Sequence, residues 1–114
     1  MESQPRELRI YETDDGNAPF SAWLDSLRDR EARARIKKRL GRVVLGNLGD
    51  YRSVGGGVFE FKIDYGSGYR VYFAQTEVLI LLLLCGGDKS TQERDILKAK
   101  QFWANFNQRE NANE

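Results

Sequence analysis

The chain of 114 residues contains no histidine, one cysteine and two prolines. Without histidine it cannot form a serine–histidine or cysteine–histidine catalytic pair, and one cysteine cannot build a zinc site of the usual composition. Cys85 cannot form an intrachain disulfide, and it ends an apolar run, where we expect a buried structural thiol. Any catalysis must therefore use carboxylates, lysine, arginine or tyrosine, and we expect neither a metal nor another cofactor.

A long hydrophobic segment is also missing. The longest apolar run, Val78–Cys85, has eight residues, whereas a helix that spans a bilayer needs about 20. The first residues do not show the charged start and apolar stretch of a signal peptide. We therefore expect a cytoplasmic protein with no contact to a membrane.

The net charge is only +1, but its distribution along the chain is uneven. Residues 1–27 carry net charge −4, whereas residues 28–42 carry eight basic and two acidic side chains, net +6. The basic residues of this segment are Arg28, Arg30, Arg33, Arg35, Lys37, Lys38, Arg39 and Arg42. Charged helices are usually only solvated, but a segment this basic in a nearly neutral protein indicates a polyanion or an acidic partner.

The even composition predicts a single domain over residues 1–107, followed by a polar, disordered tail over residues 108–114. Periodicity predicts helices from Pro19 to about Leu27, from about 29 to 45, and from Ser90 onward, the last opened by a Ser90/Glu93 capping box. Alternating or continuous apolar patterns predict strands over 7–12, 51–54, 58–65, 69–75 and 78–85. The order β-α-α-β-β-β-β-α predicts an α+β domain: a mostly antiparallel twisted sheet with helices packed on one face.

The hairpin between the strands 58–65 and 69–75 gathers charged residues. If Tyr65 pairs with Tyr69, Asp64 faces Arg70, and one polar face of the sheet results. That face carries Glu60, Lys62, Asp64, Arg70 and Tyr72. Such a face can bind and cleave a phosphodiester, but the pattern also fits an ordinary solvated face with an Asp64–Arg70 ion pair.

The loop before the last helix contains a second candidate. Gly86 and Gly87 precede Lys89 and Ser90, but the spacing does not match a P-loop because Asp88 separates the second glycine from the lysine. Free backbone amides beside Lys89 can still bind one phosphate. The alternative is a capping box that needs no ligand.

Taken together, three stretches resemble the RelE/ParE toxin superfamily, and within it the phage-derived HigB-like branch of addiction-module killer proteins. The stretches are Val58–Asp64, Gly68–Phe73 and Leu81–Ile96, and the helix onset Pro19–Leu24 also matches. The similarity runs from about residue 8 to 106. It implies a RelE-like toxin of a type II toxin–antitoxin module, with a helix-turn-helix antitoxin encoded in the adjacent gene as its partner.

The resemblance further implies a ribosome-dependent, metal-independent mRNA endoribonuclease that inhibits translation. In that chemistry the 2′-hydroxyl of the RNA attacks the adjacent phosphate, and the enzyme supplies positioning, charge neutralisation and proton transfer. It implies catalytic roles for three residues, Arg70 and Lys62 at the phosphate and Glu60 as base, and RNA-phosphate contacts for three more, Lys89, Ser90 and Tyr72. Some relatives use a C-terminal histidine or tyrosine as general acid, which this chain lacks, so the acid remains unassigned.

For the basic helix, the resemblance implies contacts of Arg35, Lys38 and Arg42 with the ribosome or with an acidic antitoxin segment. Two rival functions remain open, because one scaffold can serve several functions. One is a ParE-like toxin that inhibits DNA gyrase without cleaving RNA. The other is a degenerate toxin that only binds its antitoxin.

Overall fold

The computed structural model describes residues 4–112. The chain forms five strands, three α-helices and one short 3₁₀ turn, η1. The elements are β1 Glu7–Ile10, α1 Pro19–Ser26, α2 Arg30–Val44, β2 Tyr51–Gly55, β3 Val58–Ile63, β4 Tyr69–Glu77, β5 Ile80–Gly87, η1 Lys89–Thr91 and α3 Gln92–Ala112. The predicted α+β class and the order of the elements are confirmed.

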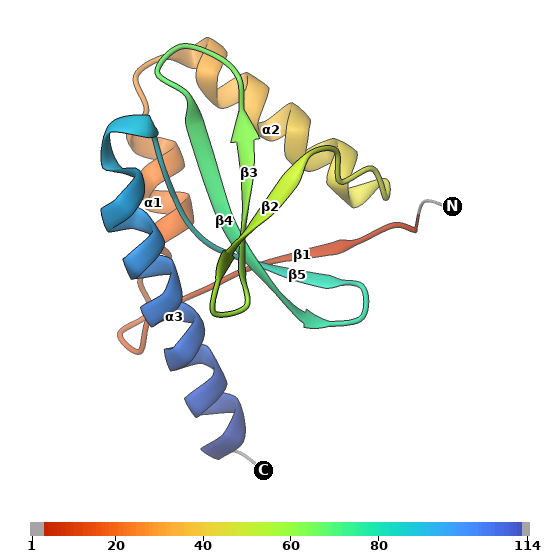
Figure 1. Ribbon diagram of the computed structural model, residues 1–114, viewed down its shortest axis with the longest axis vertical. Helices are drawn as coiled ribbons and strands as arrows, with labels where there is room; N and C mark the ends of the chain where they lie inside the picture. Colours follow the sequence, from red (N-terminus) through yellow and green to blue (C-terminus); the bar gives the residue numbers. More distant parts are fainter. Residues whose placement is uncertain (1–3, 113–114) are drawn as a thin grey trace.

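The strands form one sheet in the order β1-β5-β4-β3-β2. β1 runs parallel to β5, and the other neighbours are antiparallel. The apolar strand β5 lies between β1 and β4 inside the sheet, as its sequence predicted, but it begins two residues late because Val78 and Leu79 form the exposed turn after β4. Figure 1 shows the twisted, open sheet with β2 at one edge and β1 at the other.

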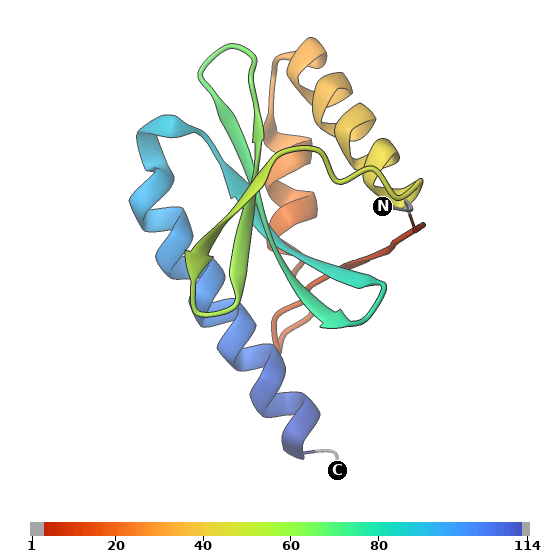
Figure 2. The ribbon, with the colours of Figure 1, turned by 45° about the vertical axis from the view of Figure 1, so that its right-hand side comes forward.

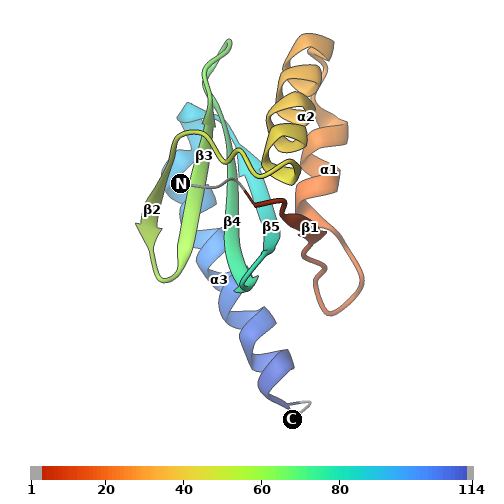
Figure 3. The same cartoon turned by 90° about the vertical axis from the view of Figure 1, so that its right-hand side faces the viewer.

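The helices lie on both faces of the sheet, not on one face as predicted. α1 and α2 cover one face, where Phe20 and Ile36 pack against Phe61 and Phe73. α3 packs on the opposite face, through Ala99 and the partly buried residues around it. Figure 3 shows α1 and α2 together on one side of the strands, with α3 apart from them. Both faces therefore contribute to the core, because successive residues of β4 and β5 point to opposite faces and are apolar on both.

The helix ends have clear local causes. Pro19 opens α1, and the Asp29 side chain accepts hydrogen bonds from two backbone amides at the start of α2. The start of α3 differs from the prediction: the Asp88 side chain caps η1 by accepting from the Ser90 amide. The predicted Ser90/Glu93 capping box is therefore wrong.

The β3–β4 hairpin has a longer loop than predicted. Ile63 pairs with Tyr69 and Lys62 with Arg70, so Asp64 lies outside the strands. The predicted pairs Tyr65–Tyr69 and Asp64–Arg70 are wrong. Gly66 and Gly68, in the loop between the strands, both have positive φ values, which glycine adopts at no steric cost.

The last helix continues well past the predicted domain end. α3 extends to Ala112, so the expected disordered tail is helical over 108–112, while residues 113–114 lie outside the described residues. The Arg109 guanidinium donates to the Glu12 carbonyl at 2.6 Å, and the Tyr11 hydroxyl donates to Asn105 at 2.6 Å. These contacts dock the end of α3 onto the loop after β1, although α3 extends beyond the edge of the sheet (Figure 2). Within residues 4–112, no helix is both long enough and apolar enough to cross a membrane.

Candidate functional site

An open pocket of about 400 Å³ lies where β2, β3 and β4 meet the start of α3. It is lined by Asp50, Tyr51, Arg52, Glu60, Lys62, Arg70 and Gln92. Three predicted catalytic residues, Glu60, Lys62 and Arg70, therefore lie in one pocket. We call it the arginine pocket.

Arg70 is held rigidly at the base of the arginine pocket. Only 6% of the residue is exposed, and its Nη1 donates to the Gly68 carbonyl at 2.6 Å. Its Nε lies 3.6 Å from Glu60 Oε2, close enough for an ion pair. This Nε has no hydrogen-bond partner in the described part of the chain. The Nε is itself buried and faces Glu60, so it serves to hold the guanidinium in place. A guanidinium fixed in this way in the lining of an open pocket is suited to bind an anion.

Glu60 connects the cations of the arginine pocket. It is 3% exposed, and its two oxygens accept from Arg52 Nε at 2.9 Å and from Gln92 Nε2 at 3.0 Å. Burial acts to raise the pKa of this carboxyl, but the hydrogen bonds from Arg52 and Gln92 outweigh it, and the pKa is lowered. Glu60 is therefore ionised at neutral pH and suited to position Arg70. A lowered pKa does not support its predicted role as the base.

Tyr72 does not line the arginine pocket. The residue is fully buried, and its hydroxyl has no hydrogen-bond partner among residues 4–112. Burial, followed by the negative charge of Glu60, raises its pKa above the ordinary value. The hydroxyl therefore stays protonated and out of reach of a ligand, in contrast to the predicted phosphate contact.

Lys62 is an exposed cation of the arginine pocket that, unlike Arg52, is not paired with Glu60. It lies opposite Arg70 on β3, and no hydrogen bond or ion pair occupies its ammonium group within residues 4–112. Its position beyond Phe61, the last residue of β3 paired with the edge strand β2, leaves it open to solvent. Lys62 is thus free to meet a ligand that Arg70 binds.

Lys89 and Ser90 lie on the other side of Arg70. The Lys89 amide donates to the Ser67 carbonyl at 3.4 Å, next to Gly68, which accepts from Arg70. Ser90, however, donates through both its amide and its hydroxyl to Asp88 Oδ1, at 2.9 and 2.5 Å. The structure thus places an exposed Lys89 near the arginine pocket, while the groups of Ser90 are used within the loop.

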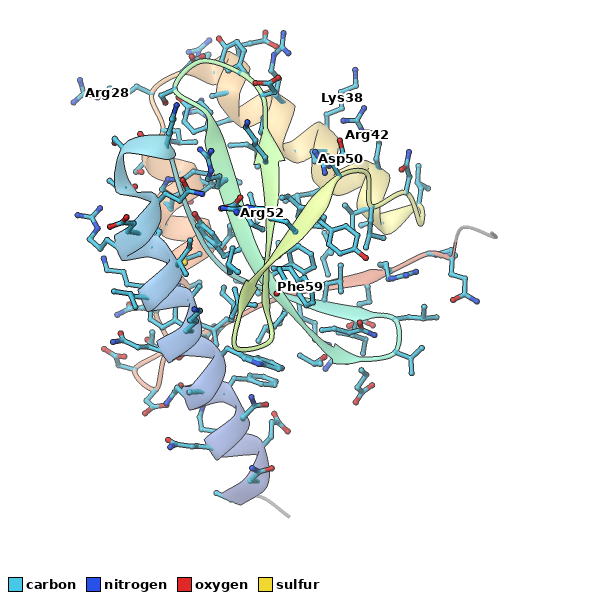
Figure 4. The ribbon with its side chains drawn as sticks, in the orientation of Figure 1. Arg28, Lys38, Arg42, Asp50, Arg52 and Phe59 are labelled. Atoms are coloured by element: carbon cyan, nitrogen blue, oxygen red, sulfur yellow. The ribbon has the colours of Figure 1, made fainter. Side chains whose placement is uncertain are left out.

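The basic helix α2 borders a larger groove of about 810 Å³, which we call the α2 groove. Arg35, Lys38 and Arg42 all line it, so the three predicted contact residues share one surface. Arg35 is paired with Glu31 at 3.0 Å and stacks over Tyr65. Lys38 and Arg42 project from α2 on the side of Asp50, as Figure 4 shows.

Arg39 has a structural role between α2 and the sheet. Its guanidinium donates to the carbonyls of Lys62 and Leu48, both at 3.1 Å, and lies over the Phe61 ring. These bonds attach the α2–β2 connection and the end of β3 to α2. They fix the floor of the α2 groove.

The sequence analysis missed Arg52, Gln92 and Asp50. Arg52 lies opposite Glu60 on the neighbouring strand, a pairing that the sequence reveals only once the β2–β3 register is known. Gln92 reaches Glu60 from the start of α3, 32 residues away in sequence. No local pattern could have indicated that contact, because it depends on α3 crossing the second face of the sheet.

The arrangement defines an α+β protein with an arginine-lined pocket. The described residues contain no group of three histidine, cysteine or acidic side chains that could hold a metal ion. No family model matches the chain. A protein of Haemophilus influenzae (strain ATCC 51907 / DSM 11121 / KW20 / Rd), described as an uncharacterized protein, is 49% identical over 81 residues, which is 71% of this chain and 82% of the relative. The chain belongs to the same protein family as this relative.

Proposed function

We propose that this chain is a RelE/ParE-type toxin that cleaves messenger RNA on the ribosome. The observation that carries the proposal is Arg70, which is fixed by Gly68 and Glu60 and lines an open pocket together with Lys62. The resemblance in sequence to HigB-like toxins supports the same function. The homology to the Haemophilus influenzae protein does not bear on it, because that protein's description gives no activity.

In the proposed reaction the 2′-hydroxyl of the RNA attacks the adjacent phosphorus. The bond from phosphorus to the 5′-oxygen breaks, the 2′-hydroxyl gives up its proton to solvent water, and the leaving 5′-oxygen takes a proton from the Lys62 ammonium. Arg70 neutralises the charge that develops on the phosphate, and its fixed position requires no reorganisation during the reaction. Lys62 is the exposed ammonium that can protonate the leaving oxygen, while Glu60 positions Arg70.

Induced expression with transcript mapping tests this proposal. We expect expression to arrest growth, and primer extension to show new 5′ ends in transcripts only while ribosomes are translating. Arg70→Lys should recover part of the cleavage that Arg70→Ala loses, because a point charge cannot reproduce the bidentate fork. Intact transcripts during growth arrest would exclude the nuclease.

The proposal includes an antitoxin as partner. We expect co-expression of a small helix-turn-helix protein encoded beside this chain to restore growth. The basic α2 groove is one surface that an acidic antitoxin segment can use. Normal growth of cells that contain the soluble, folded chain would leave only the degenerate toxin.

A second candidate function is inhibition of DNA gyrase without cleavage. It is favoured by the lack of an accessible acid–base pair: Glu60 has a lowered pKa and Tyr72 is buried. A supercoiling assay with purified gyrase separates the two functions. Inhibition of supercoiling together with intact transcripts would select the gyrase inhibitor.

A further inference from the structure

The arginine pocket and the α2 groove meet at the edge of the sheet. Lys62 and Asp50 line both of them. The edge strand β2 begins at Tyr51, opposite Phe61, so nothing on β2 covers the end of β3 between the two hollows. A ligand held by Arg70 can therefore continue past Lys62 into the α2 groove without leaving the protein surface.

Two of the cations that α2 contributes to the groove have no partner among the described residues. Lys38 and Arg42 form no hydrogen bond or ion pair within residues 4–112, whereas Arg35 is paired with Glu31 and Arg39 with backbone carbonyls. Lys38 and Arg42 lie four positions apart on one face of α2, about 6 Å along the helix axis. They thus form a pair of neighbouring positive charges in the groove that Lys62 also lines.

We propose that the α2 groove binds the phosphodiester backbone of single-stranded RNA that continues from the phosphate at Arg70. This inference rests on the proposed function and assigns to it a second, non-catalytic RNA-binding subsite. The continuity of the two hollows favours a strand over a separate acidic peptide, because the strand that occupies the arginine pocket must leave it. Asp50 and Asp64, which also line the α2 groove, act against this binding and limit its strength.

Binding of oligonucleotides without cleavage tests the subsite directly. The probe is a fluorescent, fully 2′-O-methylated RNA of increasing length, measured by fluorescence anisotropy with the purified chain. The modified RNA lacks the attacking hydroxyl, so binding is measured whether or not the chain is a nuclease. We expect a dinucleotide to bind weakly, and affinity to rise with lengths that reach Lys38 and Arg42.

Charge variants on α2 supply the matched comparison. The double variant Lys38→Gln/Arg42→Gln should remove the gain with length and lower the slope of log affinity against log salt by about 1.4, at about 0.7 for each phosphate that is no longer neutralised. Dinucleotide binding should not change. Lys37→Gln is the control, because Lys37 is exposed on the same helix but outside the groove. Asp50→Asn should strengthen binding of the longer RNA.

Three results would overturn the subsite: affinity that does not depend on length, an equal loss in Lys37→Gln, or a double variant that loses binding to poly-glutamate but keeps binding to RNA. The last result would assign the groove to an acidic peptide. If the wild-type chain binds RNA as expected but cleaves no transcripts in cells, the proposed function is wrong and the subsite is unaffected.

Discussion

The two faces of the sheet are built on different principles. Towards α1 and α2 the sheet presents aromatic and aliphatic side chains, and the Phe61 and Phe73 rings stack with their centroids 4.1 Å apart. Towards α3 the buried set includes three charged residues: Glu60, Arg70 and Asp95. One face excludes water for stability, and the other also buries charge.

The difference matters because burying a charge is costly unless it is paired. On the α3 face each charge has specific partners: Glu60 accepts from Arg52 and Gln92, and Asp95 accepts from the Thr91 hydroxyl at 2.5 Å. Such pairs fix side-chain positions, which a binding site requires. Apolar contacts on the α1/α2 face fill space but lack the directional hydrogen bonds of the α3 face. The candidate site accordingly lies on the more costly face.

The largest effect is expected on the apolar face. Phe61→Ala removes a fully buried ring that stacks on Phe73 and supports Arg39, so the free energy of unfolding should fall by about 3–5 kcal/mol. Urea denaturation followed by circular dichroism measures it. If the free energy of unfolding falls only as much as it does for the substitution of an exposed residue, packing on the α1/α2 face does not carry the stability of the sheet.

Much of the apolar face could be predicted from the sequence. Two local patterns are enough: the alternation of Phe59, Phe61 and Ile63 along the strand, and the helical spacing of Ala32 and Ile36. Each involves residues close together in the chain, so the hydrophobic period alone predicts which side is buried. The α3 face was harder. Its polar residues, read locally, resemble a solvated surface, and only the packing of α3 over them shows that they are buried.

The hairpin register shows the same limit. The alternation correctly placed Lys62 and Arg70 on one face, but the loop length decides which residues pair, and the run of residues 64–68 allows more than one loop. The predicted partner of Arg70, Asp64, was therefore wrong. The observed partner, Glu60, lies two residues before Lys62, the residue opposite Arg70 on β3. Because Glu60 is buried, removal of Arg70 leaves a buried carboxylate with one partner fewer.

Arg70→Ala should now cost both activity and stability. RNA cleavage should fall by about 10²–10³-fold, the effect of losing one preorganised donor. The free energy of unfolding should fall by about 1–3 kcal/mol, because the buried Glu60 loses one of its partners. Primer extension and urea denaturation measure the two effects separately.

Arg52→Ala is the matched control for Arg70→Ala. It removes a guanidinium from the same carboxylate, but the Arg52 side chain is 61% exposed, so we expect a loss of about 1 kcal/mol or less. Equal losses of stability in the two variants would show that the α3 face gains nothing from burying Arg70.

The ionisation of Glu60 predicts a pH dependence of the α3 face. Its folded pKa lies below the ordinary value of 4.5, so its contribution to stability is present above that value and is lost as the pH falls through the folded pKa. Stability of the wild type should thus fall more steeply in acid than that of Glu60→Gln. Denaturation at a series of pH values measures both curves. Parallel curves would mean that the pKa of Glu60 is the same in the folded and unfolded chain.

The smallest effect is expected for Tyr72→Phe, and it separates packing from hydrogen bonding on the α3 face. The Tyr72 hydroxyl is buried without a partner among the described residues, so its removal should leave the free energy of unfolding unchanged or raise it by up to about 1 kcal/mol. Tyr11→Phe is the matched control, because the Tyr11 hydroxyl on the same face donates to Asn105 at 2.6 Å, and its loss should cost about 1 kcal/mol. RNA cleavage should persist in Tyr72→Phe, since the hydroxyl cannot reach a ligand. A stable Tyr72→Phe protein that no longer cleaves RNA would instead show that the α3 face opens during the reaction and brings this hydroxyl to the phosphate.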